Sequence, residues 1–104
     1  MKTDFETIIN AVADAADLRP CQILCRKRFP ETIDARWIAV KMLRDEGFYT
    51  SKIARLMNMT TRNVNRIIYA VEVRLSKDDR SLVNILEAAR KQIGNIRETS
   101  SFGG

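Results

Sequence analysis

The stretch from Ile53 to Ile68 constrains this chain more than any other part of its sequence. Its apolar residues recur at helical spacing in two groups, which predicts a short helix followed by a longer one. Ala54 is small enough to let two helices approach closely, and Asn58, four residues later, suits a turn with positive φ. Thr60 is the predicted N-cap of the second helix, because its hydroxyl can accept a hydrogen bond from an otherwise unpaired backbone N–H.

Two helices joined by a tight turn at this spacing are typical of a helix-turn-helix, whose second helix enters the major groove of DNA. The pair shares one apolar seam, which is formed by Ile53, Met57, Met59, Val64, Ile67 and Ile68. An ordinary corner between two helices of a bundle would show the same seam. The pattern alone therefore leaves both interpretations open.

The rest of the chain also shows helical periodicity, and no segment has the alternation of a half-buried strand. A capping box that begins at Thr3 predicts a first helix to about Ala16, and Pro20 suits the first turn of a short second helix. A central helix is predicted from an N-cap at Thr32 to a stop at Gly47. We therefore expect an all-α fold, a compact bundle of about six helices that contains the helix-turn-helix.

The later helix boundaries follow from the same signals. The predicted boundaries are an N-cap at Thr50, a continuation of the longer motif helix through Leu75, a start of the last helix at Asp78 and Asp79, and its end at Gly94. Residues 1–94 are expected to form a single helical domain. Residues 95–104 hold few apolar side chains and are expected to form a flexible tail.

The chain of 104 residues carries a net charge of +5, and this charge is distributed unevenly. Residues 19–77 hold thirteen Lys and Arg against five Asp and Glu, whereas residues 1–18 have a net charge of −3 and residues 78–104 of zero. An excess of cations around the motif indicates a surface that binds phosphates. A surface that is merely solvated more often mixes the two signs.

Several classes of function lack the residues they need. The sequence has no His and only two Cys, Cys21 and Cys25, so soft ligands cannot complete a tetrahedral zinc site. We expect both cysteines to be reduced, buried and structural. We also expect no cofactor and no enzymatic activity, since neither a general base of the usual kind nor a Gly-rich phosphate loop is present.

The sequence also carries no signal for a membrane. No apolar run approaches the roughly 20 residues that span a bilayer. Acidic residues interrupt the N-terminus where a signal peptide would be apolar. We therefore expect a cytoplasmic, nucleoid-associated protein.

If the second helix of the motif enters a groove, its outward face near the N-terminus carries the contacts. The predicted base-reading residues are Thr61, Arg62, Asn65, Arg66 and Tyr69. Arg can read guanine and Asn can read adenine through paired hydrogen bonds. The residues predicted to contact the minor groove or the phosphate backbone are Arg26, Lys27, Arg28, Arg36, Arg44, Lys52, Arg55 and Thr60. The run from Arg26 to Arg28 would also suit a solvated loop.

Four segments of the sequence resemble the C-terminal DNA-binding domain of DnaA, the bacterial replication initiator. They are residues 11–18, which resemble its first helix and turn, residues 23–28, similar to its Leu-Leu-Ser-Lys-Arg-Arg segment, residues 35–40, similar to Pro-Arg-Gln-Met-Ala-Met, and residues 53–55, similar to the start of its motif. The resemblance implies a helical bundle that binds double-stranded DNA, with Arg28 in the minor groove and Arg36 and Arg44 on phosphates. No segment resembles the ATPase module of the family, so ATP binding is not implied.

The resemblance does not extend to the start of the predicted recognition helix. Where the family carries Arg-Asp-His-Thr-Thr-Val, residues 59–64 of this chain are Met-Thr-Thr-Arg-Asn-Val, so the family's target sequence is not implied. We expect sequence-specific binding of double-stranded DNA in a replication-associated or regulatory role, with replication or transcription machinery as a candidate protein partner. The alternative is a helical protein–protein module that no longer reads DNA and docks through its acidic first helix or through exposed Phe5 and Phe48.

Overall fold

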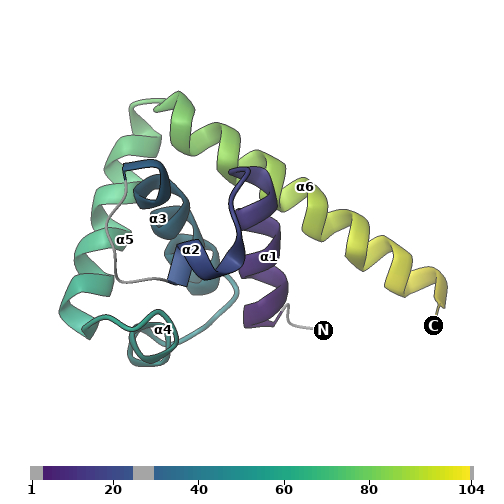
Figure 1. The fold of residues 1–104 in the computed structure, drawn as a ribbon, viewed down its shortest axis with the longest axis horizontal. Helices are drawn as coiled ribbons and strands as arrows, with labels where there is room; N and C mark the ends of the chain where they lie inside the picture. The colour runs from purple at the N-terminus through teal and green to yellow at the C-terminus, as the bar shows by residue number, and fades with distance from the viewer. Residues whose placement is uncertain (1–3, 25–29, 104) are drawn as a thin grey trace.

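The computed structural model describes residues 4–24 and 30–103, with side chains for 4–24 and 32–94. These residues form six helices and no strand (Figure 1). The helices are α1 (Phe5–Ala15), α2 (Pro20–Leu24), α3 (Pro30–Asp45), α4 (Thr50–Leu56), α5 (Thr61–Ser76) and α6 (Arg80–Gly103). The all-α fold expected from the sequence is confirmed. In the described part of the chain, no helix is both long enough and apolar enough to cross a membrane.

Helix α3 lies at the centre of the bundle and contacts each of the other five helices. It buries Ala35, Ile38, Ala39, Val40 and Leu43 completely. On one side of α3, helix α1 packs against α2 and α6, and on the other side α4 packs against α5 (Figure 1). Among the described residues, α1 contacts neither α4 nor α5, so the bundle separates the acidic first helix from the α4–α5 pair.

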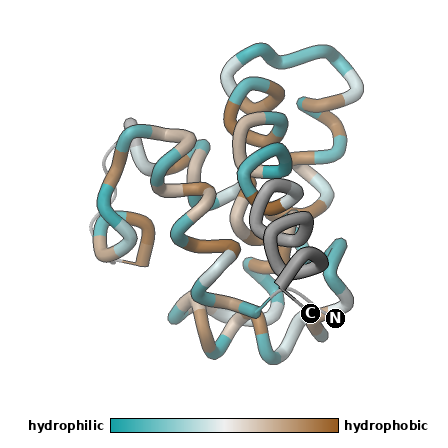
Figure 2. The backbone as a smooth tube through the Cα atoms, turned by 90° about the vertical axis from the view of Figure 1, so that its right-hand side faces the viewer, coloured by the Kyte–Doolittle hydropathy of each residue, from teal (hydrophilic) through white to brown (hydrophobic). Residues whose placement is uncertain are grey.

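Each long helix buries one face, as its apolar periodicity predicts. Figure 2 shows hydrophobic and hydrophilic segments alternating along the backbone of the helices. The inward residues of α1 include Ile8, Ile9 and Val12, and those of α6 are Leu82, Leu86, Ala89 and Ile93. Both helices therefore bury apolar residues that recur at helical spacing, as the helical periodicity of the chain predicts.

Four helices end in the same way, with a residue at positive φ two positions beyond the helix. These residues are Asp17 (φ 58°), Gly47 (φ 96°), Asn58 (φ 57°) and Asp78 (φ 58°). After α4, the N–H of Asn58 donates to the carbonyl of Arg55 at 3.3 Å, and the N–H of Met59 donates to the carbonyl of Ala54 at 2.8 Å. This pair of bonds is a Schellman motif. The predicted stop at Gly47 and the predicted turn at Asn58 are confirmed.

The N-caps of α1 and α3 were predicted incorrectly. Asp4 caps α1, because its Oδ1 accepts from the Thr7 N–H at 2.8 Å, and the predicted cap Thr3 lies outside the described residues. Thr32 is not a cap but a buried residue inside α3, which begins two residues earlier at Pro30. The fixed φ of proline and its missing N–H suit the first turn of a helix, so the earlier start is physically favourable.

Two later boundaries also differ from prediction. Thr50 is the first residue of α4, whose N-cap is Tyr49 without a side-chain cap bond. Helix α6 passes Gly94 and continues to Gly103. Gly94 does not adopt positive φ, and a Cβ added there would meet nothing within 4 Å, so this glycine is simply accommodated inside the helix.

The prediction of buried cysteines is wrong at Cys21, the one of the two that the structure describes, although this thiol is free as predicted. Cys21 is exposed and free, because the short helix α2 directs Ile23 into the core instead. Cys25 lies outside the described residues.

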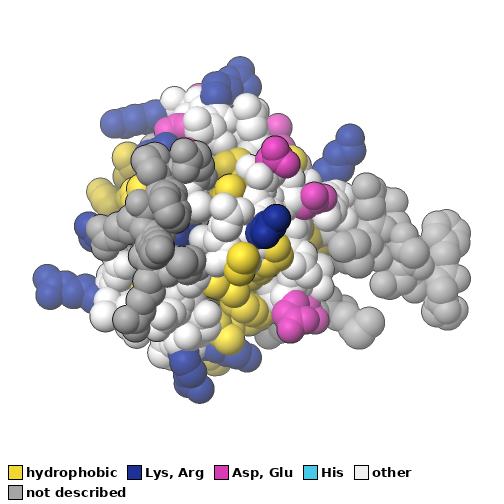
Figure 3. Space-filling view, in the orientation of Figure 1, with side chains coloured by type: hydrophobic (Ala, Val, Ile, Leu, Met, Phe, Trp, Pro, Cys, Tyr) yellow, Lys and Arg dark blue, Asp and Glu magenta, His cyan; other side chains and the backbone are white. Residues whose placement is uncertain are grey.

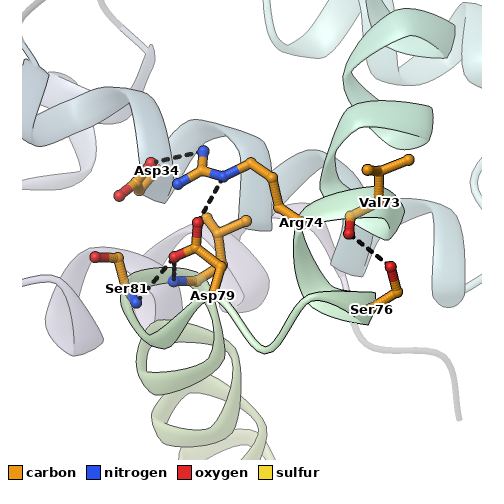
Figure 4. Close-up of polar contacts among 7 residues, drawn as sticks. Asp34, Val73, Arg74, Ser76, Asp79 and Ser81 are labelled. Atoms are coloured by element: carbon orange, nitrogen blue, oxygen red, sulfur yellow. Dashed lines mark hydrogen bonds and ion pairs between the residues drawn. The ribbon is translucent and has the colours of Figure 1, made fainter.

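The guanidinium of Arg74, near the end of α5, joins three helices (Figure 4). It donates to Asp79 Oδ2 at 2.8 Å and to Asp34 Oδ1 at 3.2 Å, and it lies 5.3 Å from the ring centre of the half-buried Trp37. Asp79 in turn caps α6, because its Oδ1 accepts from the Ser81 N–H at 3.1 Å. This network ties the end of α5 to the first half of α3 and the start of α6.

The network makes stability depend on pH. The hydrogen bond from Arg74 lowers the pKa of Asp79 below its usual value of 3.8, and the N–H groups of Leu82 and Ser81 act in the same direction. Because the folded pKa lies below the unfolded one, the carboxylate stabilises the fold above about pH 4, and this contribution is lost as the pH falls through the lowered pKa.

We expect Asp79→Asn to lower the free energy of unfolding near neutral pH and to have a shrinking effect in acid. Urea unfolding of both proteins over a series of pH values measures this difference. When Arg74 is also replaced by Met, the effect of Asp79→Asn on stability should depend less on pH, because the guanidinium that lowers the pKa of Asp79 is absent. A difference of equal size at about pH 7 and about pH 3 would contradict the role of the ionised carboxylate.

Candidate nucleic-acid interface

Helices α4 and α5 form a packed pair joined by a short turn. Ile53 and Ala54 of α4 and Val64 and Ile67 of α5 are buried, together with Met57 in the turn. Of the predicted seam, Met59 and Ile68 are partly buried against the same core. The predicted cap is confirmed, since Thr60 Oγ1 accepts from the N–H of Asn63 at 3.1 Å.

The opposite face of α5 is open to solvent. All five predicted base-reading residues lie exposed on it: Thr61, Arg62, Asn65, Arg66 and Tyr69. Their exposure follows from helix geometry, because burial of Val64, Ile67 and Val71 turns the intervening residues outward. Tyr69 has 72% of its surface exposed, and Glu72, nearly one turn later, is the first acidic residue of this helix.

This region is also free of negative charge. Residues 47–71 contain four cations, Lys52, Arg55, Arg62 and Arg66, and no Asp or Glu. None of the four forms an ion pair within the described part of the chain, in contrast to cations such as Lys41 and Arg74. Figure 3 shows Lys and Arg at the left and lower edges, over α5 and α4, whereas the acidic side chains of this face are scattered toward the top and right. The positive potential of this region is therefore not cancelled by neighbouring carboxylates.

A cleft of about 600 Å³ opens between the first turns of α5 and the first half of α3. Its lining residues, which define the α3–α5 cleft, are Arg36, Asn58, Met59, Thr60, Arg62, Asn63 and Arg66. A smaller hollow of about 130 Å³ beside it is backed by Ile33, Trp37 and Ile67. The fold thus brings Arg36, 26 residues earlier in the sequence than Arg62, to the same cleft as two of the predicted base readers.

Other predicted phosphate-binding residues lie elsewhere. Arg44 donates from Nη1 to the carbonyl of Phe48 at 3.3 Å, and the Lys52 ammonium lies 5.2 Å from the ring centre of Phe48. Neither residue lines the α3–α5 cleft. Arg55 is exposed on α4. The predicted basic loop, residues 26–28, lies outside the described residues, so its role stays a prediction.

Asn63 is a cleft residue that the sequence analysis did not identify as functional. Arg66 donates from Nη2 to Asn63 Oδ1 at 3.0 Å. The available signal was its spacing, since residues three apart on a helix are neighbours on its surface.

The side chains on the outward face of α5 and in the α3–α5 cleft are mainly hydrogen-bond donors. Guanidinium groups match the geometry of phosphates and of guanine edges, and the Asn amides can both donate and accept. Among the described residues, no group of three or more Cys, Asp or Glu is placed to hold a metal ion.

No family model and no curated protein matches this chain. The resemblance to the DnaA domain therefore stays a prediction, and the interface is interpreted from its own geometry and charge.

Proposed function

We propose that this protein binds double-stranded DNA sequence-specifically through α4, the turn and α5, acting as a helix-turn-helix in a replication-associated or regulatory role. The observation that carries the proposal is the acid-free segment 47–71, whose cations include two arginines on the outward face of α5. The major groove is about 12 Å wide and admits one α-helix. A helix that packs by one face and presents Arg and Asn on the other suits that groove.

The contacts divide by position. Arg62, Asn65 and Arg66 lie in the first two turns of α5, where a recognition helix meets base edges. Arg36, at the opposite wall of the α3–α5 cleft, is placed to hold the phosphate backbone beside that helix. The DNA-contacting surface of α5 ends at about the turn that carries Glu72. The exposed carboxylate of this residue would be repelled by nearby phosphates.

The resemblance of residues 11–18, 23–28, 35–40 and 53–55 to the DnaA domain supports a role connected with replication. The separation of charge in the fold supports DNA binding more generally, since the exposed acidic residues of α1 do not lie beside α4 and α5.

The alternative, a protein–protein module, was expected to dock through the acidic first helix or through two exposed phenylalanines. Phe5 and Phe48 were expected to be exposed, but both are partly buried against the core, so this expectation was wrong. Phe48 is also covered by Lys52. The alternative then depends on the exposed acidic residues of α1, Glu6 and Asp14.

Selection of bound duplexes from a pool of random sequences tests the proposal. We expect enrichment of one motif, because α5 presents several side chains that discriminate base edges, each good pair being worth about 1–3 kcal/mol. Recovery of a protein partner that survives nuclease treatment, together with a pool that stays random, would support the alternative.

A further inference from the structure

We propose that Asn63 is a positioning residue, which holds Arg66 in the orientation that contacts DNA. This inference rests on the proposed function. Arg66 donates from Nη2 to Asn63 Oδ1 at 3.0 Å, and both residues line the α3–α5 cleft. The backbone of Asn63 is itself fixed, because its N–H donates to the cap oxygen of Thr60 at 3.1 Å.

The side chain of Asn63 is anchored on its other side by the core. Its Nδ2 donates to Met59 Sδ at 3.9 Å, and Met59 packs against the buried cluster. The guanidinium carries donors only, so the amide oxygen must face Arg66 and the amide nitrogen must face the sulfur. Asn63 is half-buried whereas Arg66 is exposed, so the bond connects an exposed side chain to one that packing holds in place.

Asn65 and Arg62 provide the contrast on the same helix. Both are exposed, and neither side chain makes a hydrogen bond or ion pair within the described residues. The amide of Asn65 is therefore free to contact a base, whereas the oxygen of Asn63 is already occupied. Of the two arginines, Arg66 is restrained before DNA arrives and Arg62 is not.

Restraint of a long side chain before binding lowers the entropy that is lost when it docks. A guanidinium held in one orientation also presents its N–H groups in a single direction, which favours one bidentate contact over others. We expect the loss of the Asn63 bond to weaken binding by about three- to tenfold, the effect of immobilising one flexible side chain. The preference for one base at the position that Arg66 contacts should decrease together with the affinity.

The test is a double-mutant cycle between Asn63→Leu and Arg66→Ala. Leucine has nearly the shape of asparagine, keeps the packing on Met59 and favours helix, so the fold is retained. The probe is a short labelled duplex that carries the motif enriched by the wild-type protein. Asn65→Leu is the matched control, because it removes an amide from the same helix without touching the bond to Arg66.

We expect Asn63→Leu to weaken binding in the wild-type background and to have no further effect once Arg66 is Ala. Asn65→Leu should weaken binding in both backgrounds. NMR relaxation of the Arg66 Nε–Hε group in the free protein gives a second readout, and it should show greater mobility in Asn63→Leu. Equal losses in both backgrounds, or unchanged mobility of Arg66, would overturn the positioning role while leaving DNA binding intact. A wild-type protein that does not bind duplex DNA would overturn the proposed function and this inference together.

Discussion

Replacement of Arg62 and Arg66 together by Ala is expected to abolish most of the sequence-specific affinity for duplex DNA. Each arginine lies exposed on the outward face of α5, in the turns that we propose meet base edges. A bidentate contact between arginine and guanine contributes about 1–3 kcal/mol of discrimination, so we expect a loss of that size for each residue. Titration of the selected duplex and of a scrambled duplex separates specific from non-specific loss.

The salt dependence of the same titrations shows whether the arginines contact bases or phosphates. Each phosphate contact contributes about −0.9 to the slope of log affinity against log salt. The control is Arg80→Ala with Lys91→Ala, which removes the same charge from exposed positions on α6. If this control pair weakens binding as much as the α5 pair does, total charge rather than the face of α5 determines affinity.

Leu43→Ala is expected to have the largest effect on stability. Leu43 is completely buried in α3, the helix that contacts all the others. Truncation of such a leucine costs about 2–5 kcal/mol, because the lost transfer energy is joined by the cost of a cavity. A domain of this size has a total stability of about 5–15 kcal/mol, so the variant should lose a large fraction of it.

Thermal and urea unfolding measure this loss, and the midpoint should fall by about 4–8 °C for each kcal/mol. The control is Leu56→Ala, the same change at a half-buried position at the end of α4, outside the residues packed against the core. Equal destabilisation by the two substitutions would contradict the central position of α3.

The helices were predictable because each buries one face. The residues of α1 and α6 that recur at helical spacing are the ones that the core covers. The caps were less predictable, since neighbouring polar residues compete for the same role. Asp4 and Thr3 both have side chains that can cap a helix. Thr32 also has one, but α3 begins earlier, at Pro30, because proline suits the first turn of a helix.

The outward face of α5 was predictable for the same reason, as it is the complement of the apolar seam. The side-chain contacts between helices and within the site were not predictable from the sequence. Arg74 meets Asp34 across 40 residues of sequence, and no local pattern indicates such a pair. The bond between Asn63 and Arg66 depends on side-chain rotamers, which spacing permits but does not determine.

Duplex selection with two proteins is the most direct test of whether the outward face of α5 reads a DNA sequence. The wild-type protein and the Arg62→Ala, Arg66→Ala variant are each incubated with the same random pool, and the bound duplexes are sequenced. We expect the wild-type protein to enrich one motif and the variant not to enrich it. If the pool bound by the wild-type protein stays random, or if the variant enriches the same motif, the face of α5 does not read DNA sequence.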